Sequence, residues 1–230
     1  MTPENGHLHP ITRAIREIRT IFAELGFDIA LGPELETEFY NFDALNIPAD
    51  HPARDMQDTF WIKSRERKVL RTQTSPVQIR YMQSHKPPFR IIVPGKVFRN
   101  EATDSTHEAQ FHQIEGLLID KEVSLAELKG TLQFFFKKFF GSDVEIRFRP
   151  SFFPFTEPSV EVDVFFRGKW LEVMGAGLVN PVVLKSAGLD PKKWRGFAFG
   201  AGIDRLVMVK HGISDIRHLY SGDLRLVNQF

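Results

Sequence analysis

Four stretches of the chain carry apolar residues at the spacing of an amphipathic helix. They cover residues 11–25, 76–83, 124–139 and 203–210. The first helix should stop at Gly26, and the third should begin at Ser124, which forms a capping-box pattern with Glu127.

Between these helices, apolar and polar residues alternate as they do in half-buried strands. The predicted strands cover residues 27–31, 90–93, 97–101, 111–119, 144–148, 160–164, 170–174 and 196–200. Pro94-Gly95 should divide the second strand from the third, and residues 41–58, with Pro48 and Pro52, should form a long ordered loop. No regular β-α-β alternation is seen. The order favours an α+β fold, an antiparallel β-sheet flanked by helices, in one domain over residues 1–230.

The composition of the chain excludes several classes of protein. The 230 residues are 42% apolar and 26% charged, as in ordinary soluble globular proteins, and the 22 phenylalanines are best explained by an aromatic core. Net charge is +1, so a nucleic acid would need help from another chain. The absence of cysteine excludes disulfides and thiolate sites and fits a reducing cytoplasm. No signal peptide or membrane span is apparent in the sequence.

The first cluster of chemically interesting residues lies on two neighbouring predicted strands. The period of two places Arg99 and Glu101 on one face of the first strand, and Phe111, Gln113 and Glu115 on one face of the second. An arginine can bind phosphate with two hydrogen bonds, a ring can stack on a base, and carboxylates can receive an amino group. Alternatively, this is a solvent-exposed face with cross-strand ion pairs.

A second cluster is the glycine-rich segment 196–205, which ends with Arg205 in the first turn of a predicted helix. Glycine allows a ligand to approach the backbone closely, and the beginning of a helix favours anions. The segment matches neither a Walker A loop nor the dinucleotide-binding fingerprint. Taken alone, it could equally be a helix-capping turn with a surface arginine.

Two further clusters combine polar and aromatic residues. If the chain is extended there, Phe153, Phe155 and Glu157 share a face that could hold an aromatic side chain and a metal ion, or could be core packing. Near the start of the predicted helix at 76–83, Ser75 and Gln78 could meet an α-amino or carboxylate group, although Ser75 could instead cap that helix.

In their order along the chain, these clusters resemble the three signature motifs of class II aminoacyl-tRNA synthetases. The motifs would occupy residues of about 9–35, 97–116 and 196–210. Within that class the chain is similar to bacterial phenylalanyl-tRNA synthetase α subunits, from about Leu8 to the end. The stretches that carry this likeness are Asn41–Pro48, His51–Asp55, Asp58–Trp61, Phe111–Gly116, Phe153–Pro158 and Gly196–Gly200.

The resemblance implies that ATP and phenylalanine form phenylalanyl-adenylate, and that the phenylalanyl group then passes to tRNA(Phe). The implied catalytic residues are Arg99 and Arg205. The implied ATP-binding residues are Arg99, Glu101, His107, Phe111 and Arg205. The implied phenylalanine-binding residues are Ser75, Gln78, Gln113, Glu115, Phe153, Phe155, Ala198 and Gly200, and Glu157 is the implied Mg²⁺ ligand. Positioning and electrostatics suffice for this substitution at phosphorus, so no protein acid, base or nucleophile is required.

The family also implies a cytoplasmic enzyme with a β subunit, in an α2β2 assembly. The α subunits of that family normally begin with a tRNA-binding coiled coil, whereas this chain starts almost at the first motif. It would therefore be a truncated or a naturally short form. Asp204 stands where many relatives have glutamate.

Two alternatives remain open at this stage. A non-catalytic relative that binds an amino acid or a partner should have lost Arg99, Glu101 or Arg205, and none is lost. A class II enzyme for another amino acid, such as phosphoserine, should have a basic pocket, against which the pair Phe153 and Phe155 argues.

Overall fold

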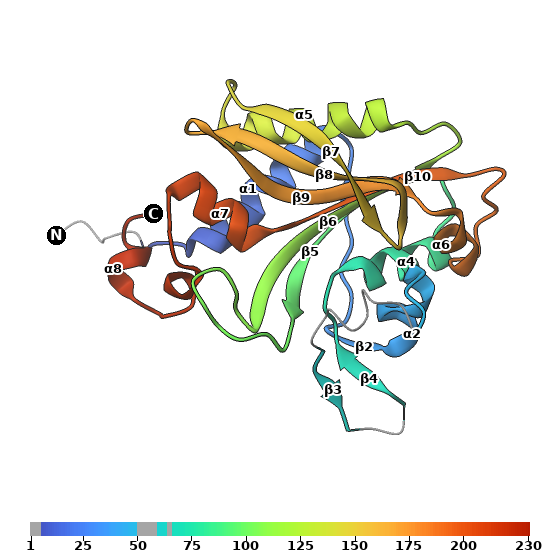
Figure 1. The fold of residues 1–230 in the computed structure, drawn as a ribbon, viewed down its shortest axis with the longest axis horizontal. Coiled ribbons are helices and arrows are strands. Elements are labelled where there is room, and N and C mark those ends of the chain that lie inside the picture. The colour runs from blue at the N-terminus through green and yellow to red at the C-terminus, as the bar shows by residue number, and fades with distance from the viewer. Residues whose placement is uncertain (1–5, 50–58, 64–65) are drawn as a thin grey trace.

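A computed structural model describes residues 6–49, 59–63 and 66–230 of the chain. Its centre is a seven-stranded sheet with the order β1-β5-β6-β10-β9-β8-β7 (Figure 1). The strands are β1 (Asp28–Ile29), β5 (Phe89–Phe98), β6 (Gln110–Asp120), β7 (Glu145–Phe153), β8 (Thr156–Phe166), β9 (Lys169–Val179) and β10 (Arg195–Gly202). All neighbours in this sheet are antiparallel except β1 and β5, which are parallel.

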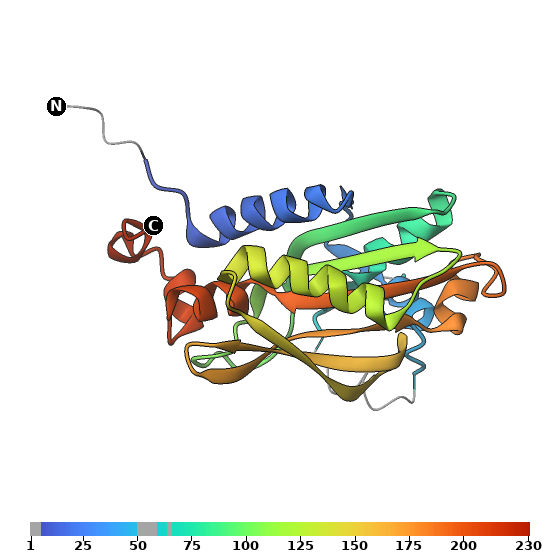
Figure 2. The same cartoon turned by 90° about the horizontal axis from the view of Figure 1, so that it is seen from above.

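Helices α1 (Pro10–Glu24) and α5 (Leu125–Phe140) cover one face of the sheet (Figure 2). They enclose an aromatic core in which the Phe22 ring stacks on Phe135 and Phe199, with centroid distances of 4.9 and 5.2 Å. The predicted start of α5 at Ser124 is confirmed, because the Ser124 hydroxyl caps the helix by accepting a hydrogen bond from the Glu127 N–H at 3.2 Å.

The opposite face carries short helices and a small sheet. The elements there are β2 (Leu35–Thr37), α2 (Glu38–Asn41), η1 (Asp43–Leu45), β3 (Trp61–Ile62), β4 (Lys68–Leu70), α4 (Ser75–Ser84) and α6 (Pro181–Ser186). The C-terminal part contains α7 (Ile203–His211), η2 (Ile216–Leu219) and α8 (Leu224–Val227). No helix in the described ranges has the length and apolarity needed to cross a membrane.

Alternation along the central strands decides which side chains face which layer. On β6, Ile114 and Leu118 point into the core under α1 and α5, whereas Leu117 and Ile119 point into a second core beneath α4 and α6. The period of two therefore turns Gln113 and Glu115 toward the second layer.

The α+β prediction is confirmed, and so are the four predicted helices, each to within a few residues. The predicted break at Pro94-Gly95 is wrong, because β5 is continuous. β1 pairs with β5 only as far as Ile92, so Pro94 lies on a strand edge, where its missing N–H is tolerated. Part of the predicted loop 41–58 is helical, and residues 50–58 lie outside the described part.

Candidate active site

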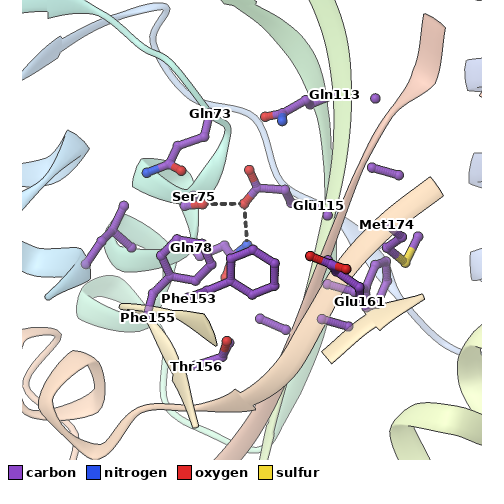
Figure 3. Close-up of a pocket in the computed structure, with 18 of the residues that line it drawn as sticks. Gln73, Ser75, Gln78, Gln113, Glu115, Phe153, Phe155, Thr156, Glu161 and Met174 are labelled. Atoms are coloured by element: carbon purple, nitrogen blue, oxygen red, sulfur yellow. Dashed lines mark hydrogen bonds between the residues drawn. The ribbon is translucent and has the colours of Figure 1, made fainter. Parts of the chain in front are cut away.

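A cavity of about 1200 Å³ opens on the sheet face that carries α4. Its walls come from the start of α4, from β6, β9 and β10, and from the hairpin between β7 and β8 (Figure 3). All the residues implied to bind phenylalanine line it: Ser75, Gln78, Gln113, Glu115, Phe153, Phe155, Ala198 and Gly200. Segments more than a hundred residues apart thus meet around one space.

The polar end of the cavity is built around the carboxylate of Glu115, which is 5% exposed. It accepts hydrogen bonds from the Thr74 N–H at 2.9 Å, the Ser75 hydroxyl at 2.6 Å and the Gln78 amide at 2.7 Å. Burial raises the pKa of Glu115, while the donors from Ser75 and Thr74 and the charge of Arg71 oppose that rise. The start of α4 is thereby tied to β6, and the carboxylate is held in one orientation.

Two buried polar atoms beside Glu115 have no hydrogen-bond partner among the described residues, namely Gln113 Oε1 and Thr74 Oγ1. Buried acceptors without a partner are rare in folded proteins because they cost about 1–3 kcal/mol each. Gln113 lines the cavity, so its free acceptor is available to a ligand that donates a hydrogen bond.

Gln73 also lines the cavity, and sequence reasoning missed it as a site residue. Its amide donates a hydrogen bond to the Asn41 carbonyl at 3.2 Å. The signal available in the sequence was its place between Arg71 and Ser75, in a segment already noted for its hydroxyls and amides.

The apolar end of the cavity consists of the rings of Phe153 and Phe155, which lie 5.8 Å apart and nearly parallel, at 8°. The predicted extended face through Phe153, Phe155 and Glu157 is wrong, because β7 ends at Phe153 and β8 begins at Thr156. The turn brings both rings to the same wall. Gly175 on β9 makes room for Phe153, since a Cβ there would lie 2.9 Å from its ring.

Arg99 reaches the cavity from the loop just after β5, which ends at Phe98 and does not continue to residue 101 as predicted, and Arg205 reaches it from α7. Neither arginine forms an ion pair with a described residue. Arg99 Nε donates to the Thr72 carbonyl at 3.3 Å, and its guanidinium lies 5.1 Å from the Phe111 ring centre. Burial lowers the pKa of Arg99, and the charges of Glu101 and Glu115 oppose this. Arg205 is exposed in the first turn of α7.

His107 also lines the cavity, from the loop between β5 and β6. Its Nδ1 lies 3.0 Å from the Asp104 carboxylate, which fixes the imidazole. Glu101 and Phe111 do not line the cavity, although Phe111 shares the strand face of Gln113 and Glu115. The Phe111 ring is contacted by Arg99 instead.

Comparison with known proteins places the chain in a family. The family model of the tRNA synthetases class II core domain (F) matches residues 1–230. The phenylalanine–tRNA ligase α subunit of Proteus mirabilis (strain HI4320) is 58% identical over 228 residues, which cover 99% of this chain and 69% of that protein. The α subunit of Edwardsiella ictaluri (strain 93-146) is 57% identical over the same shares. The chain belongs to the phenylalanine–tRNA ligase α-subunit family.

The fold is shared more widely within the class. A crystal structure of pyrrolysyl-tRNA synthetase from Desulfitobacterium hafniense superposes with a TM-score of 0.71 at 17% identity, covering 91% of this chain and 72% of that one. At this identity the match shows the architecture alone. The α-subunit family thus uses a sheet and helix arrangement that also serves other class II synthetases.

Glu157, the metal position implied by the α-subunit resemblance, is exposed on β8 and does not line the cavity. Its carboxylate accepts a hydrogen bond of 3.5 Å from the Asn180 amide. Two other carboxylates, Glu161 and Glu172, do line the cavity and were missed from the sequence. Arg149 pairs with both, at 2.9 and 3.0 Å.

Proposed function

We propose that this chain is the catalytic α subunit of a phenylalanine–tRNA ligase, which activates phenylalanine with ATP and transfers it to tRNA(Phe). The observation that carries the proposal is a single cavity with two unlike ends. One end has the Glu115 carboxylate and the free acceptor of Gln113, and the other has the parallel rings of Phe153 and Phe155. An amino acid with an ammonium group and an apolar ring matches both ends.

In this proposal the ammonium group of phenylalanine donates hydrogen bonds to Gln113 Oε1 and to oxygens around Glu115. Ser75 and Gln78 hold the Glu115 carboxylate in place for that contact. The substrate ring packs against the two phenylalanine rings, and burial of such a ring contributes roughly 1.5–3 kcal/mol. Ala198 and Gly200 of β10, which line the cavity, leave space for the ring.

The first chemical step is attack by a substrate carboxylate oxygen on the α-phosphorus of ATP. A bond forms between that oxygen and phosphorus, the bond to the β-phosphate oxygen breaks, and pyrophosphate leaves with the electron pair. Arg99 stabilises the charge on the α-phosphate, and Arg205 binds the nucleotide from α7. Phe111 and Glu101 are assigned to the adenine, and His107 to the pyrophosphate end.

In the second step the 2′-hydroxyl of the terminal adenosine of tRNA attacks the carbonyl carbon of the adenylate. The new ester bond forms, the hydroxyl proton passes to an oxygen of the departing phosphate, and AMP leaves with the electron pair of the broken bond. The side chains of this chain act in both steps by binding and orientation, because bringing the reacting groups together removes much of the entropic barrier.

Mg²⁺ would supply positive charge to the phosphates of ATP. Within the described ranges no group of three or more His, Cys, Asp or Glu side chains could hold a metal by itself. This donor set fits Mg²⁺ that arrives with ATP, because the ion commonly takes one or two carboxylates together with phosphate oxygens. Glu157 stays the ligand predicted from the resemblance, and Glu172, which lines the cavity, is a second candidate.

We assign one catalytic domain to residues 1–230, with its three motifs at about 9–35, 97–116 and 196–210, and place its reaction in the cytoplasm. The partner is a β subunit, in an α2β2 assembly. Support comes from the apolar side chains Ile29, Leu31 and Leu35, which are exposed on the segment that follows α1. With a net charge of +1, the chain also needs other parts of the enzyme to hold tRNA.

The test is amino-acid-dependent exchange of pyrophosphate into ATP, measured across a panel of amino acids with the β subunit present. We expect phenylalanine to support rapid exchange and phosphoserine to support none. Exchange with a different amino acid would contradict the assigned substrate. Binding of phenylalanine without any exchange would favour a non-catalytic module, although Arg99, Glu101 and Arg205 are all present.

A further inference from the structure

The corner where β10 turns into α7 carries Arg205 but has no side-chain cap. The N-cap residue is Gly202, which has no side chain, and Ile203, Asp204 and Arg205 follow in the first turn of α7. Arg205 is exposed in that first turn, so the conformation of the turn sets where its side chain leaves the helix. Residue 202 pairs with Gln113 on β6, so the corner lies directly beside the cavity.

Asp204 is the residue that ties this turn to the rest of the molecule. Its side chain is fully buried, and its carboxylate accepts a hydrogen bond of 2.7 Å from the backbone N–H of His112 on β6. The other carboxylate oxygen accepts from the Tyr220 hydroxyl, just after η2. One carboxylate therefore joins three segments: α7, β6 and the C-terminal region.

His112 completes the set. Its Nδ1 lies 3.1 Å from the Tyr220 oxygen. Since tyrosine has one O–H, and that proton is donated to Asp204, the tyrosine oxygen is the acceptor toward His112. His112 Nδ1 therefore carries a proton and donates a hydrogen bond to the Tyr220 oxygen. The hydrogen bonds run from His112 to Tyr220 and from Tyr220 to Asp204.

We propose that Asp204, Tyr220 and His112 form a positioning network that aims Arg205 at the nucleotide. The inference rests on the proposed function, in which Arg205 binds ATP. The three residues touch neither substrate. They act through Arg205, because Asp204 precedes Arg205 in the chain and ties the first turn of α7 to β6.

The electrostatics of the network are consistent with a buried, closely hydrogen-bonded set. Burial raises the pKa of Asp204, and the donors Tyr220 and His112 oppose this. Burial also lowers the pKa of His112 and raises that of Tyr220, and in both groups this favours the neutral form. Hydrogen bonds to a buried carboxylate are stronger than hydrogen bonds between neutral groups, so they can hold the first turn of α7 in one orientation.

The test removes one hydroxyl from the network. We expect Tyr220→Phe, assayed in the complex with the β subunit, to lower kcat/KM for ATP about tenfold, while KM for phenylalanine changes less than twofold. The thermal midpoint should stay within a few degrees of wild type. Tyr40→Phe is the matched control, because it also removes a hydrogen-bonded hydroxyl, 2.9 Å from Gln83 Oε1, outside the cavity.

A second pair of variants distinguishes loss of the hydrogen bond from His112 from a general loss of structure. His112→Asn keeps an N–H donor close to the Nδ1 position, whereas His112→Leu removes it. We expect the asparagine variant to keep most of the wild-type kcat/KM for ATP and the leucine variant to behave like Tyr220→Phe. Equal losses in both variants would overturn the role of the His112 donor.

The decisive measurement is ATP affinity by calorimetry for wild type, Tyr220→Phe, Arg205→Ala and the double variant. If Tyr220 acts through Arg205, each single variant weakens affinity several-fold, and Tyr220→Phe adds nothing to Arg205→Ala. Wild-type affinity in Tyr220→Phe, or additive losses in the double variant, would overturn the network. Normal ATP affinities without phenylalanine-dependent exchange would instead overturn the proposed function, and a wild type that binds no ATP would overturn both.

Discussion

At the scale of single residues, the cavity is marked by two arginines that form no ion pair with a described residue. The electric field of an arginine in an ion pair is partly cancelled by its partner. Arg99 instead contacts one carbonyl and one aromatic ring, and Arg205 makes neither kind of contact. Their charges remain available to phosphate. This is the preorganisation expected where negative charge develops during a reaction.

Replacing Arg99 with alanine should remove one such charge and leave the fold intact. The expected cost is about 3 kcal/mol of transition-state stabilisation, or about a hundredfold in the rate of pyrophosphate exchange. Arg195→Ala, at the exposed first position of β10, is the control and should keep normal exchange. A loss of less than tenfold for Arg99→Ala would make Arg99 a structural residue.

The size of the side chain at position 198 should set the largest ring that the cavity accepts. Ala198 lines the cavity and is only half-buried. Overpacking a close-packed site typically costs about 1–3 kcal/mol, so the wild type should exclude p-chlorophenylalanine and Ala198→Gly should accept it. Phenylalanine itself should lose little. The measurement is the ratio of exchange rates for the two amino acids, and an unchanged ratio would show that Ala198 does not limit the size of the substrate ring.

Residue by residue, the sequence predicted the cavity well where one strand or one motif supplies the side chains. Strand alternation is enough to bring Gln113 and Glu115 to one face. It could not reveal Glu161 and Glu172, because they approach the cavity through the pairing of β8 with β9, and that pairing has a register shift between Val162 and Asp163. A shift of this kind depends on tertiary packing.

At the scale of elements, the contact between β6 and the aromatic core leaves no free volume. Gly116 lies opposite Phe199 on β10, and a Cβ at residue 116 would lie 2.0 Å from the Phe199 ring. That ring is itself stacked between Phe22 and the strands. The absence of a side chain at Gly116 is therefore a packing requirement.

Gly116→Ala should accordingly destabilise the protein by about 1–3 kcal/mol or more, because the aromatic cluster must shift to admit the methyl group. Gly130→Ala is the matched control: this glycine is exposed on α5 with no atom within 4 Å of the new Cβ. There the change should stabilise by about 0.5–1 kcal/mol through helix propensity. Urea unfolding of both variants checks the opposite signs, and equal effects would contradict this view of β6.

Elements with strong local signals were predicted, and elements that depend on their neighbours were not. The helix α5 carries its own cap and its own apolar stripe, so its start at Leu125 follows from local sequence. In contrast, β5 continues through Pro94 and Gly95 by pairing with β6, and Arg71 lies against Gly95 and donates to the carbonyl of Lys96 at 2.7 Å. That contact joins segments that are far apart in the sequence, so no local pattern of residues predicts it.

At the scale of the whole molecule, the exposed apolar residues after α1 make an assembly prediction. Leu31 is 78% exposed, and Leu31→Asp should weaken association with the β subunit at least tenfold, because a charge cannot be buried in an apolar contact without cost. Leu224→Asp, at 69% exposure on α8, is the control. Size-exclusion chromatography with light scattering on the co-expressed subunits measures their association. If both variants associate equally with the β subunit, the interface does not include Leu31.

The position of β10 in the sheet has a consequence for biosynthesis. This strand, Arg195–Gly202, is the last of the sheet in chain order, yet it lies between β6 and β9 and pairs with both. Until it leaves the ribosome, β6 and β9 each present an unpaired edge. At roughly 5–20 residues per second, several seconds separate the synthesis of β6 from that of β10. During that interval the nascent chain exposes two strand edges that can pair with other chains, so it is more prone to aggregation than the completed fold.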